Sequence, residues 1–195
     1  TALERTQYQT LLGVSESATS IELALIESMV DRQMDGLMLI GPRMAATDLT
    51  QVAARIPTVL IGHHPMPESN FDTVNNDDIL GATLVVQHLV TMGYRNIAYL
   101  SQRLVDTEQL MVTAQREIGF RAAMQEAGLA KNMQIIYADQ TSRETQGAAR
   151  HLLQSRNPPD AIFCWTDFIA LEVLSVAKEL GLDVPGDLAV VGYDN

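Results

Sequence analysis

The sequence predicts an α/β fold in which helices cover both faces of a parallel, doubly wound sheet. Two observations lead to this prediction. Short apolar runs alternate with longer stretches of helical spacing along the 195 residues, and such alternation is typical of repeated strand–helix units. The short runs are also apolar at consecutive positions, as strands are when both faces of a sheet are buried.

The predicted strands are the apolar runs, each five or six residues long. In chain order they are residues 8–13, 36–41, 58–62, 96–101, 134–138, 161–165 and 188–193. In such a sheet, ligands bind beyond the carboxyl ends of the strands, where the strand order reverses. Candidate binding residues are therefore sought directly after these runs.

The predicted helices are the longer stretches, whose apolar residues recur at intervals of three and four. In one of them Leu80, Leu84 and His88 follow this spacing, and Asp167 is placed to cap another. Glycine follows several stretches, as is common where helices end. The stretches are residues 17–34, 47–56, 78–94, 116–129, 143–155 and 167–181, and the glycines stand at 93, 128 and 181.

The division of the chain is predicted near Ser101. The link after the run 96–101 is longer and more polar than the others, which favours a crossing between subdomains. We therefore expect an N-terminal subdomain over residues 1–100 and a C-terminal subdomain over residues 101–195.

Composition excludes several classes of protein. The net charge is −11, and the 13 basic residues are scattered, whereas nucleic-acid-binding surfaces cluster them, so the chain is not expected to bind DNA by itself. No apolar stretch approaches the ~20 residues of a membrane helix. The first ten residues lack a secretory signal, and the single Cys164 excludes an internal disulfide. We expect a cytoplasmic protein that does not contact membranes.

Signatures of catalysis are missing from the sequence. Glycine-rich dinucleotide and phosphate loops are absent, and the segment 13–17 lacks the closing glycine of a nucleophile elbow. His63 and His64 are adjacent, so their side chains diverge in an extended chain and cannot hold one metal together. Cys164 lies within an apolar run and is expected in the core. We predict no enzyme activity, no catalytic residue, no cofactor and no metal.

Six segments occur in a recognisable order: MDGLMLIG (34–41), VNNDDILGA (74–82), HLVTMGYRNIAYL (88–100), REIGFRAAMQEAGL (116–129), AIFCWTDFIAL (161–171) and VPGDLAVVGYDN (184–195). Together they resemble the effector-binding domain of the LacI/GalR family of bacterial transcription regulators. The resemblance implies a periplasmic-binding-protein-like fold, with two doubly wound parallel-sheet subdomains joined by a hinge and a small molecule between them. It also implies truncation at both ends, with the first strand and the C-terminal segments missing.

Two residues match positions at which the family contacts its effector. Asp194 stands in the VGYD segment; its alternative role is a cap on the following turn. Arg116 opens REIGF, and its planar guanidinium suits hydroxyls, carboxylates or phosphates; its alternative role is a surface residue paired with Glu117. Replacing either by Ala is expected to abolish the ligand response and leave the unliganded fold nearly as stable.

The tip of the run 161–165 supplies two further candidates for effector contact. Thr166 stands where some relatives use asparagine. Trp165 is the only tryptophan of the chain; it can stack on a sugar face or serve in packing.

The remaining candidates are His63 and Asn76. His63 follows the run 58–62, where relatives often have Asp-Arg, so the set of donors there differs from that of the family. Asn76 precedes Asp77, which matches the aspartate of the family's V-x-x-D-N block, with Asp78 in place of asparagine. Asp77 and Asp78 are expected to start a helix at its positive end rather than to bind ligand.

The function implied by the resemblance is the sensing and dimerisation domain of a LacI-type regulator. A sugar, a sugar derivative or a nucleobase would act as effector. Its binding would alter the operator affinity of a helix-turn-helix domain outside this chain, in a homodimer. The alternative is a periplasmic sugar-binding protein of a transporter, which shares the fold but requires a signal peptide upstream of Thr1.

Overall fold

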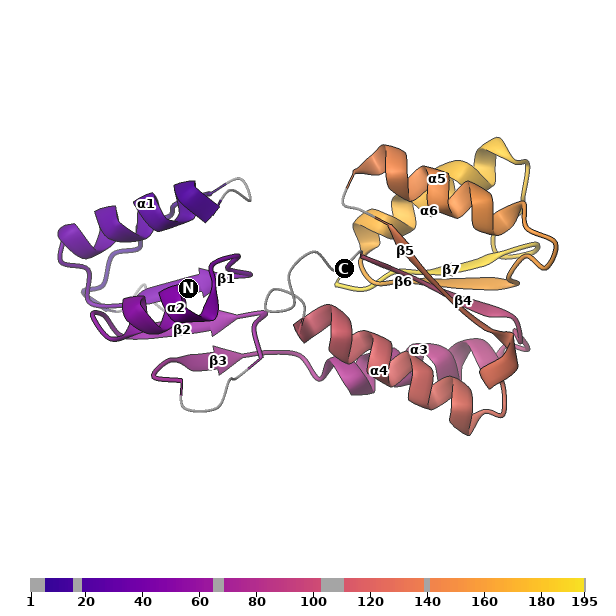
Figure 1. Cartoon of the computed structure of the whole chain (residues 1–195), viewed down its shortest axis with the longest axis horizontal. Helices are drawn as coiled ribbons and strands as arrows, with labels where there is room; N and C mark the ends of the chain where they lie inside the picture. Colours follow the sequence, from indigo (N-terminus) through magenta and orange to yellow (C-terminus); the bar gives the residue numbers. More distant parts are fainter. Residues whose placement is uncertain (1–5, 16–18, 65–68, 103–110, 139–140, 195) are drawn as a thin grey trace. The chain divides into compact units, whose positions relative to one another are not determined.

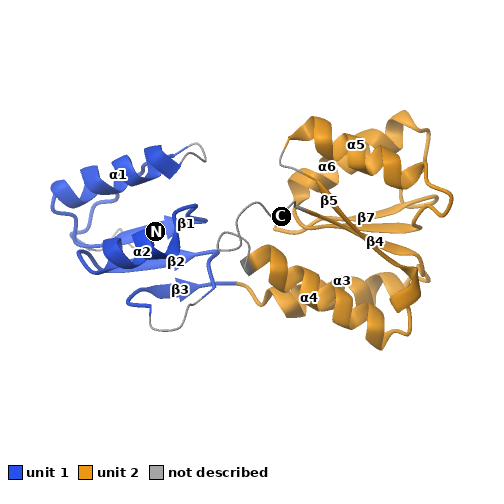
Figure 2. Cartoon of the chain, viewed as in Figure 1, with its two compact units in different colours: residues 1–75 blue, residues 76–195 orange. Residues whose placement is uncertain are grey.

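The computed structural model describes residues 6–15, 19–64, 69–102, 111–138 and 141–194. The chain divides into two compact units, unit 1 (Thr1–Asn75) and unit 2 (Asn76–Asn195), shown in Figure 2. Among the described residues, no helix is long and apolar enough to cross a membrane.

Unit 1 is built around a parallel sheet with the strand order β1-β2-β3. Its core joins both helices to the sheet, because Ile26 of α1 and Leu49 of α2 pack in one cluster with Leu37 and Leu60 of the strands. Its elements are α1 (Thr19–Asp31), β1 (Leu37–Ile40), α2 (Ala46–Ala53), β2 (Thr58–Ile61) and β3 (Asp72–Val74).

Unit 2 carries a parallel sheet with the strand order β5-β4-β6-β7. The order reverses at β4, because β5 lies on one side of it and β6 on the other. The elements are α3 (Asp78–Thr91), β4 (Ile97–Gln102), α4 (Met111–Glu126), the short 3-10 helix η2 (Ala130–Asn132), β5 (Met133–Ala138), α5 (Ser142–Leu153), β6 (Ala161–Cys164), α6 (Asp167–Glu179) and β7 (Ala189–Val191).

Helices cover both faces of this second sheet (Figure 1). Along β4 the side chains alternate: Tyr99 packs in the cluster of α3 and α4, whereas Leu100 packs in the cluster of α5 and α6. On the first face Tyr99 stacks on Phe120 of α4 with ring centroids 5.2 Å apart, and Phe163 lies 5.0 Å from Tyr99. The predicted doubly wound parallel sheet is confirmed.

Helices α3 and α4 approach each other closely at Gly119. A Cβ placed on Gly119 would overlap the backbone carbonyl oxygen of Ile79. Only glycine therefore allows this separation of the two helices. The contact matters for the site, because α3 and α4 each contribute a charged residue to it.

Two expectations about strands need correction. The run 8–13 is not a strand; Tyr8, Leu11 and Leu12 are exposed, and this segment pairs with none of the described strands. Conversely, β3 (Asp72–Val74) was not predicted, because three residues with one aspartate give no apolar run. The six other predicted strands and the six predicted helical stretches coincide with elements of the described structure.

The division of the chain also differs from the one expected at residues 100/101. The units meet between Asn75 and Asn76. The reason is strand pairing: β4, expected in the first subdomain, is hydrogen-bonded to both β5 and β6 of unit 2.

Candidate functional site

The polar residues of unit 2 gather where β6 and β7 end. Trp165 and Thr166 follow β6, and residues 192–194 follow β7. The two tips are tied together, because the backbone N–H of Asp167 donates to the carbonyl of Tyr193 at 2.9 Å. Since β6 neighbours β4, these tips lie beside the point where the strand order reverses, which is where α/β sheets bind ligands.

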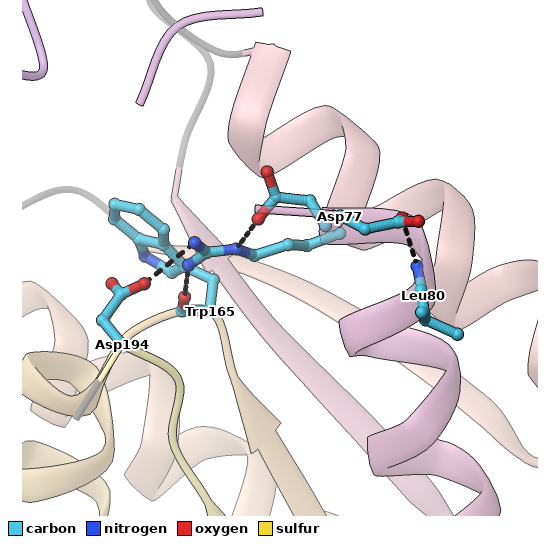
Figure 3. A network of polar contacts seen from close by, with 6 residues as sticks. Asp77, Leu80, Trp165 and Asp194 are labelled. Carbon is cyan, nitrogen blue, oxygen red and sulfur yellow. Dashed lines mark hydrogen bonds and ion pairs between the residues drawn. The ribbon is translucent and has the colours of Figure 1, made fainter. Parts of the chain in front are cut away.

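Arg116 is the centre of this site. From α4 its guanidinium reaches three partners, drawn in Figure 3, where Trp165 and Asp194 are labelled. Nε donates to Asp78 Oδ1 at 2.7 Å, Nη1 to the carbonyl oxygen of Trp165 at 2.5 Å, and Nη2 to Asp194 Oδ1 at 2.9 Å. The side chain thus joins α3, α4 and the tips of β6 and β7. Among the described residues these bonds use three of its five N–H groups.

The two carboxylates differ in exposure. The Asp78 side chain is 2% exposed, whereas that of Asp194 is 50% exposed. Burial opposes the charge on Arg116, but the hydrogen bonds with Asp78 and Asp194 outweigh it and raise the pKa of the guanidinium. The Asp78 pair is therefore a buried contact, whereas the Asp194 carboxylate is accessible to solvent.

Tyr193 supports the guanidinium from one side. The carbon at the centre of the Arg116 guanidinium lies 3.7 Å from the centroid of the Tyr193 ring, a cation–π contact. The ring fits because position 81 in α3 is glycine: a Cβ there would overlap the Tyr193 hydroxyl. Asp194, the next residue, has a φ of 95°, which is unfavourable for a non-glycine residue. Such backbone strain is common at binding sites.

Trp165 and Thr166 have different roles at the tip of β6. Among the described residues, the indole Nε1 of Trp165 is buried and has no hydrogen-bond partner. Thr166 caps α6, since its hydroxyl accepts from the N–H of Ile169 at 3.4 Å. Asp167, expected to be the cap, is instead the first helical residue.

Among the described contacts of Arg116, neither His63 nor Asn76 is a partner. His63 is in unit 1 after β2, is buried, and accepts a hydrogen bond from the Asn75 amide at its backbone carbonyl, 2.8 Å away. Asn76 is exposed and opens unit 2. Asp77 caps α3, as expected, by accepting from the N–H of Leu80 at 2.9 Å. Within the described ranges, no group of three or more potential ligands could hold a metal ion.

Sequence reasoning missed two members of the site. Asp78 was expected only to start a helix, and Tyr193 was read as part of a strand. The alternative role of Arg116 as a surface residue is wrong, because Arg116 is 3% exposed and Glu117 pairs with Arg121 at 2.7 Å. The sequence did indicate a further role for Asp78, because two acidic residues stand at the start of this helix and only one of them is required as the cap.

A parallel, doubly wound unit with an ionic centre beside its switch point has the architecture of a ligand-binding α/β domain. The family described as "Periplasmic binding protein-like domain" matches residues 86–195, more than half of the chain. The chain belongs to this family, and within it to the effector-binding domains of LacI/GalR regulators.

Similar proteins agree with this assignment. The HTH-type transcriptional repressor CytR of Escherichia coli is 29% identical over 189 residues, covering 96% of this chain and 54% of CytR. A LacI transcriptional regulator from Rhodococcus superposes with a TM-score of 0.80 at 31% identity, covering 89% of this chain and 63% of that structure. A complex of the regulator CelR with cellobiose gives 0.74 at 27% identity, covering 91% and 54%. The chain spans about half the length of the curated relatives it matches.

Proposed function

We propose that this chain is the small-molecule-sensing part of a LacI-type transcription regulator and that its effector contacts the Arg116 centre. In the whole protein, effector binding would change the affinity of a helix-turn-helix domain for operator DNA. The protein would act in the cytoplasm as a homodimer and would not be an enzyme. A transcription regulator is favoured over a transporter's binding protein because the relatives described above are regulators.

One observation carries the proposal. A buried guanidinium and a half-exposed carboxylate, 2.9 Å apart, lie beside the switch point of unit 2. The carboxylate of Asp194 can accept hydrogen bonds from ligand hydroxyls, while the remaining N–H groups of Arg116 can donate to ligand oxygens. Trp165 adds an indole donor and an aromatic ring. Together these groups suit a small polar molecule.

The role of the remaining candidates is part of the proposal. Asp194, Arg116 and Trp165 would contact the effector directly. Thr166 would hold the start of α6 in place, and its hydroxyl would contact the effector only from the capping position. His63 and Asn76 stay secondary candidates.

The test is a thermal-shift screen of the intact protein against sugars, sugar acids, nucleosides and nucleobases. A true effector at 100 times its Kd should stabilise the native state by about 2.7 kcal/mol. The matched variant Asp194→Asn keeps the shape of the side chain but removes its charge, and it should lose most of this response. Operator binding, measured by mobility shift, should change with the same compound. A screen without any stabilising compound, or an unaltered response in Asp194→Asn, would refute the proposal.

A further inference from the structure

The backbone of Asp194 is strained at the point where its carboxylate meets Arg116. Asp194 has a φ of 95°, in the left-handed region that residues other than glycine rarely adopt, and its Oδ1 lies 2.9 Å from Arg116 Nη2. A strained conformation of this kind persists only where the surrounding contacts hold it. The contacts of the two preceding residues, Gly192 and Tyr193, show what these constraints are.

The Tyr193 ring contacts both the Arg116 guanidinium and helix α3. On the side of Arg116, the central carbon of the guanidinium lies 3.7 Å from the ring centroid. On the side of α3 the ring lies against Gly81, where a Cβ would come within 2.8 and 2.9 Å of two ring carbons and closer still to the hydroxyl oxygen. Real Cβ atoms do not approach other atoms so closely, so any side chain at position 81 would displace the ring or the helix.

The backbone of the same segment is held by helix α6. The N–H of Asp167, the first residue of α6, donates to the carbonyl oxygen of Tyr193 at 2.9 Å. At Gly192 a Cβ would overlap the Asp167 carboxylate, so glycine is what allows the tip of β7 to lie against the start of α6. Helices α3 and α6 cover opposite faces of the sheet. Tyr193 is therefore fixed from both faces, which restricts the position of the next residue, Asp194.

We propose that Gly81 and Tyr193 are positioning residues of the effector site. The ring, lying on Gly81, keeps the Arg116 guanidinium in place and keeps Asp194 in its strained conformation beside it. Neither Gly81 nor Tyr193 needs to touch the effector for this role. The consequence for affinity rests on the proposed function, because it takes the Arg116 centre to be the effector site. The consequence for the geometry of Arg116 and Asp194 does not depend on any ligand.

Four substitutions in the intact protein separate positioning from general damage. Gly81→Ala adds the Cβ that meets the ring, whereas its control, Gly147→Ala, adds a Cβ in helix α5 where there is open space. Tyr193→Leu removes the ring without adding an atom at position 81, so it tests the inference even if Gly81→Ala folds poorly. Tyr193→Phe removes the hydroxyl oxygen, which is the atom nearest to the new Cβ. Combined with Gly81→Ala, it should relieve part of the overlap.

The first measurement is the NMR resonance of the Arg116 Nε–H in isotope-labelled protein. This group is buried and donates to Asp78 at 2.7 Å, so its exchange with solvent is slow. Because the guanidinium lies over the Tyr193 ring, the ring current shifts this resonance. Gly81→Ala and Tyr193→Leu should both reduce the ring-current shift, and Gly147→Ala should leave it unchanged. In the Tyr193→Phe background, Gly81→Ala should change the resonance less than it does in the wild-type protein.

The second measurement is the Kd of glucose, ribose and adenosine, titrated by calorimetry. For each compound that binds the wild-type protein, Gly81→Ala and Tyr193→Leu should raise the Kd about tenfold or more, the loss expected when a hydrogen bond to a charged group is misplaced. Gly147→Ala should not raise it. Wild-type resonances in both Gly81→Ala and Tyr193→Leu, or a wild-type Kd in both, would overturn the positioning role. Absence of binding by all three compounds counts against the proposed function alone, and the resonance then decides the positioning role.

Discussion

Removing Arg116 should destabilise unit 2 more than removing either half of an ordinary surface pair. Arg116→Met keeps the unbranched stem and deletes the charge, so the Asp78 carboxylate, whose side chain is 2% exposed, loses its ion pair with the Arg116 guanidinium. Breaking a buried pair in this way costs about 3–5 kcal/mol. Asp194 adds little, because a carboxylate that is 50% exposed regains solvent, so Asp194→Asn should cost about 0–1 kcal/mol. This corrects the expectation from sequence that an Arg116 variant would be nearly as stable as the wild-type protein.

The double variant Asp78→Asn/Arg116→Met separates the buried charge from simple loss of packing. With both charges gone, much of the cost should disappear, and the two substitutions should show a coupling of about 2 kcal/mol or more. The assay is urea denaturation of the intact protein at pH 7 and fixed protein concentration. Trp165 fluorescence reports on unit 2, since Trp165 is the only tryptophan of the chain. The reasoning fails if Arg116→Met costs no more than Asp194→Asn, or if the double-variant cycle shows no coupling.

Three further predictions concern unit 2. Gly119→Ala should lower the free energy of unfolding by about 1–3 kcal/mol, because the new Cβ would meet the Ile79 carbonyl oxygen. The control Gly147→Ala adds a Cβ where α5 has open space, and it should raise the free energy of unfolding by up to ~1 kcal/mol. Equal effects of the two variants in denaturant titrations would contradict the close approach of α3 and α4. Thr166→Ala should lower the free energy of unfolding by about 0.5–1 kcal/mol in the same titrations, because α6 loses its N-cap. An unchanged free energy of unfolding would contradict the capping role of Thr166. Burial raises the pKa of the Cys164 thiol, so above about pH 8.5 the native protein keeps this proton while the unfolded chain releases it. Above that pH the free energy of unfolding should therefore fall by up to ~1.4 kcal/mol per pH unit. The variant Cys164→Ala should not show this pH dependence.

The sheet of unit 2 was predictable from sequence because each of its strands is apolar at consecutive positions. Such runs have few alternatives to burial between two layers of helices. The run 8–13 shows the limit of this reasoning. The run combines the apolar Tyr8, Leu11 and Leu12 with the polar Gln9 and Thr10. A strand also requires a partner strand, and the run itself does not encode one. The alternation of strands and helices likewise does not say which strands pair, so β4 was assigned to the wrong half of the chain.

The candidate site was predictable only in part, and for a similar reason. Arg116 and Asp194 were singled out by their matches to family segments, and the structure brings them together across 78 positions of sequence. Asp78 has a sufficient local explanation, because an acid in the first turn of a helix is favourable by itself. Its contact with Arg116, 38 positions away, depends on how closely α3 and α4 pack. That packing depends on a glycine whose importance appears only in three dimensions.

The exposures of the two carboxylates suggest how one arginine can serve both stability and binding. The Nε edge faces Asp78 in the interior and holds α3 to α4, while the Nη2 edge faces Asp194 at half exposure. A ligand that replaces or bridges the second contact leaves the first intact, so binding need not disturb the core. Because the same guanidinium also donates to the Trp165 carbonyl and stacks on Tyr193, any shift of Arg116 toward a ligand would act at once on the tips of β6 and β7. If the effector binds at Arg116, as proposed, a single side chain would couple its binding to the geometry of these two strand ends.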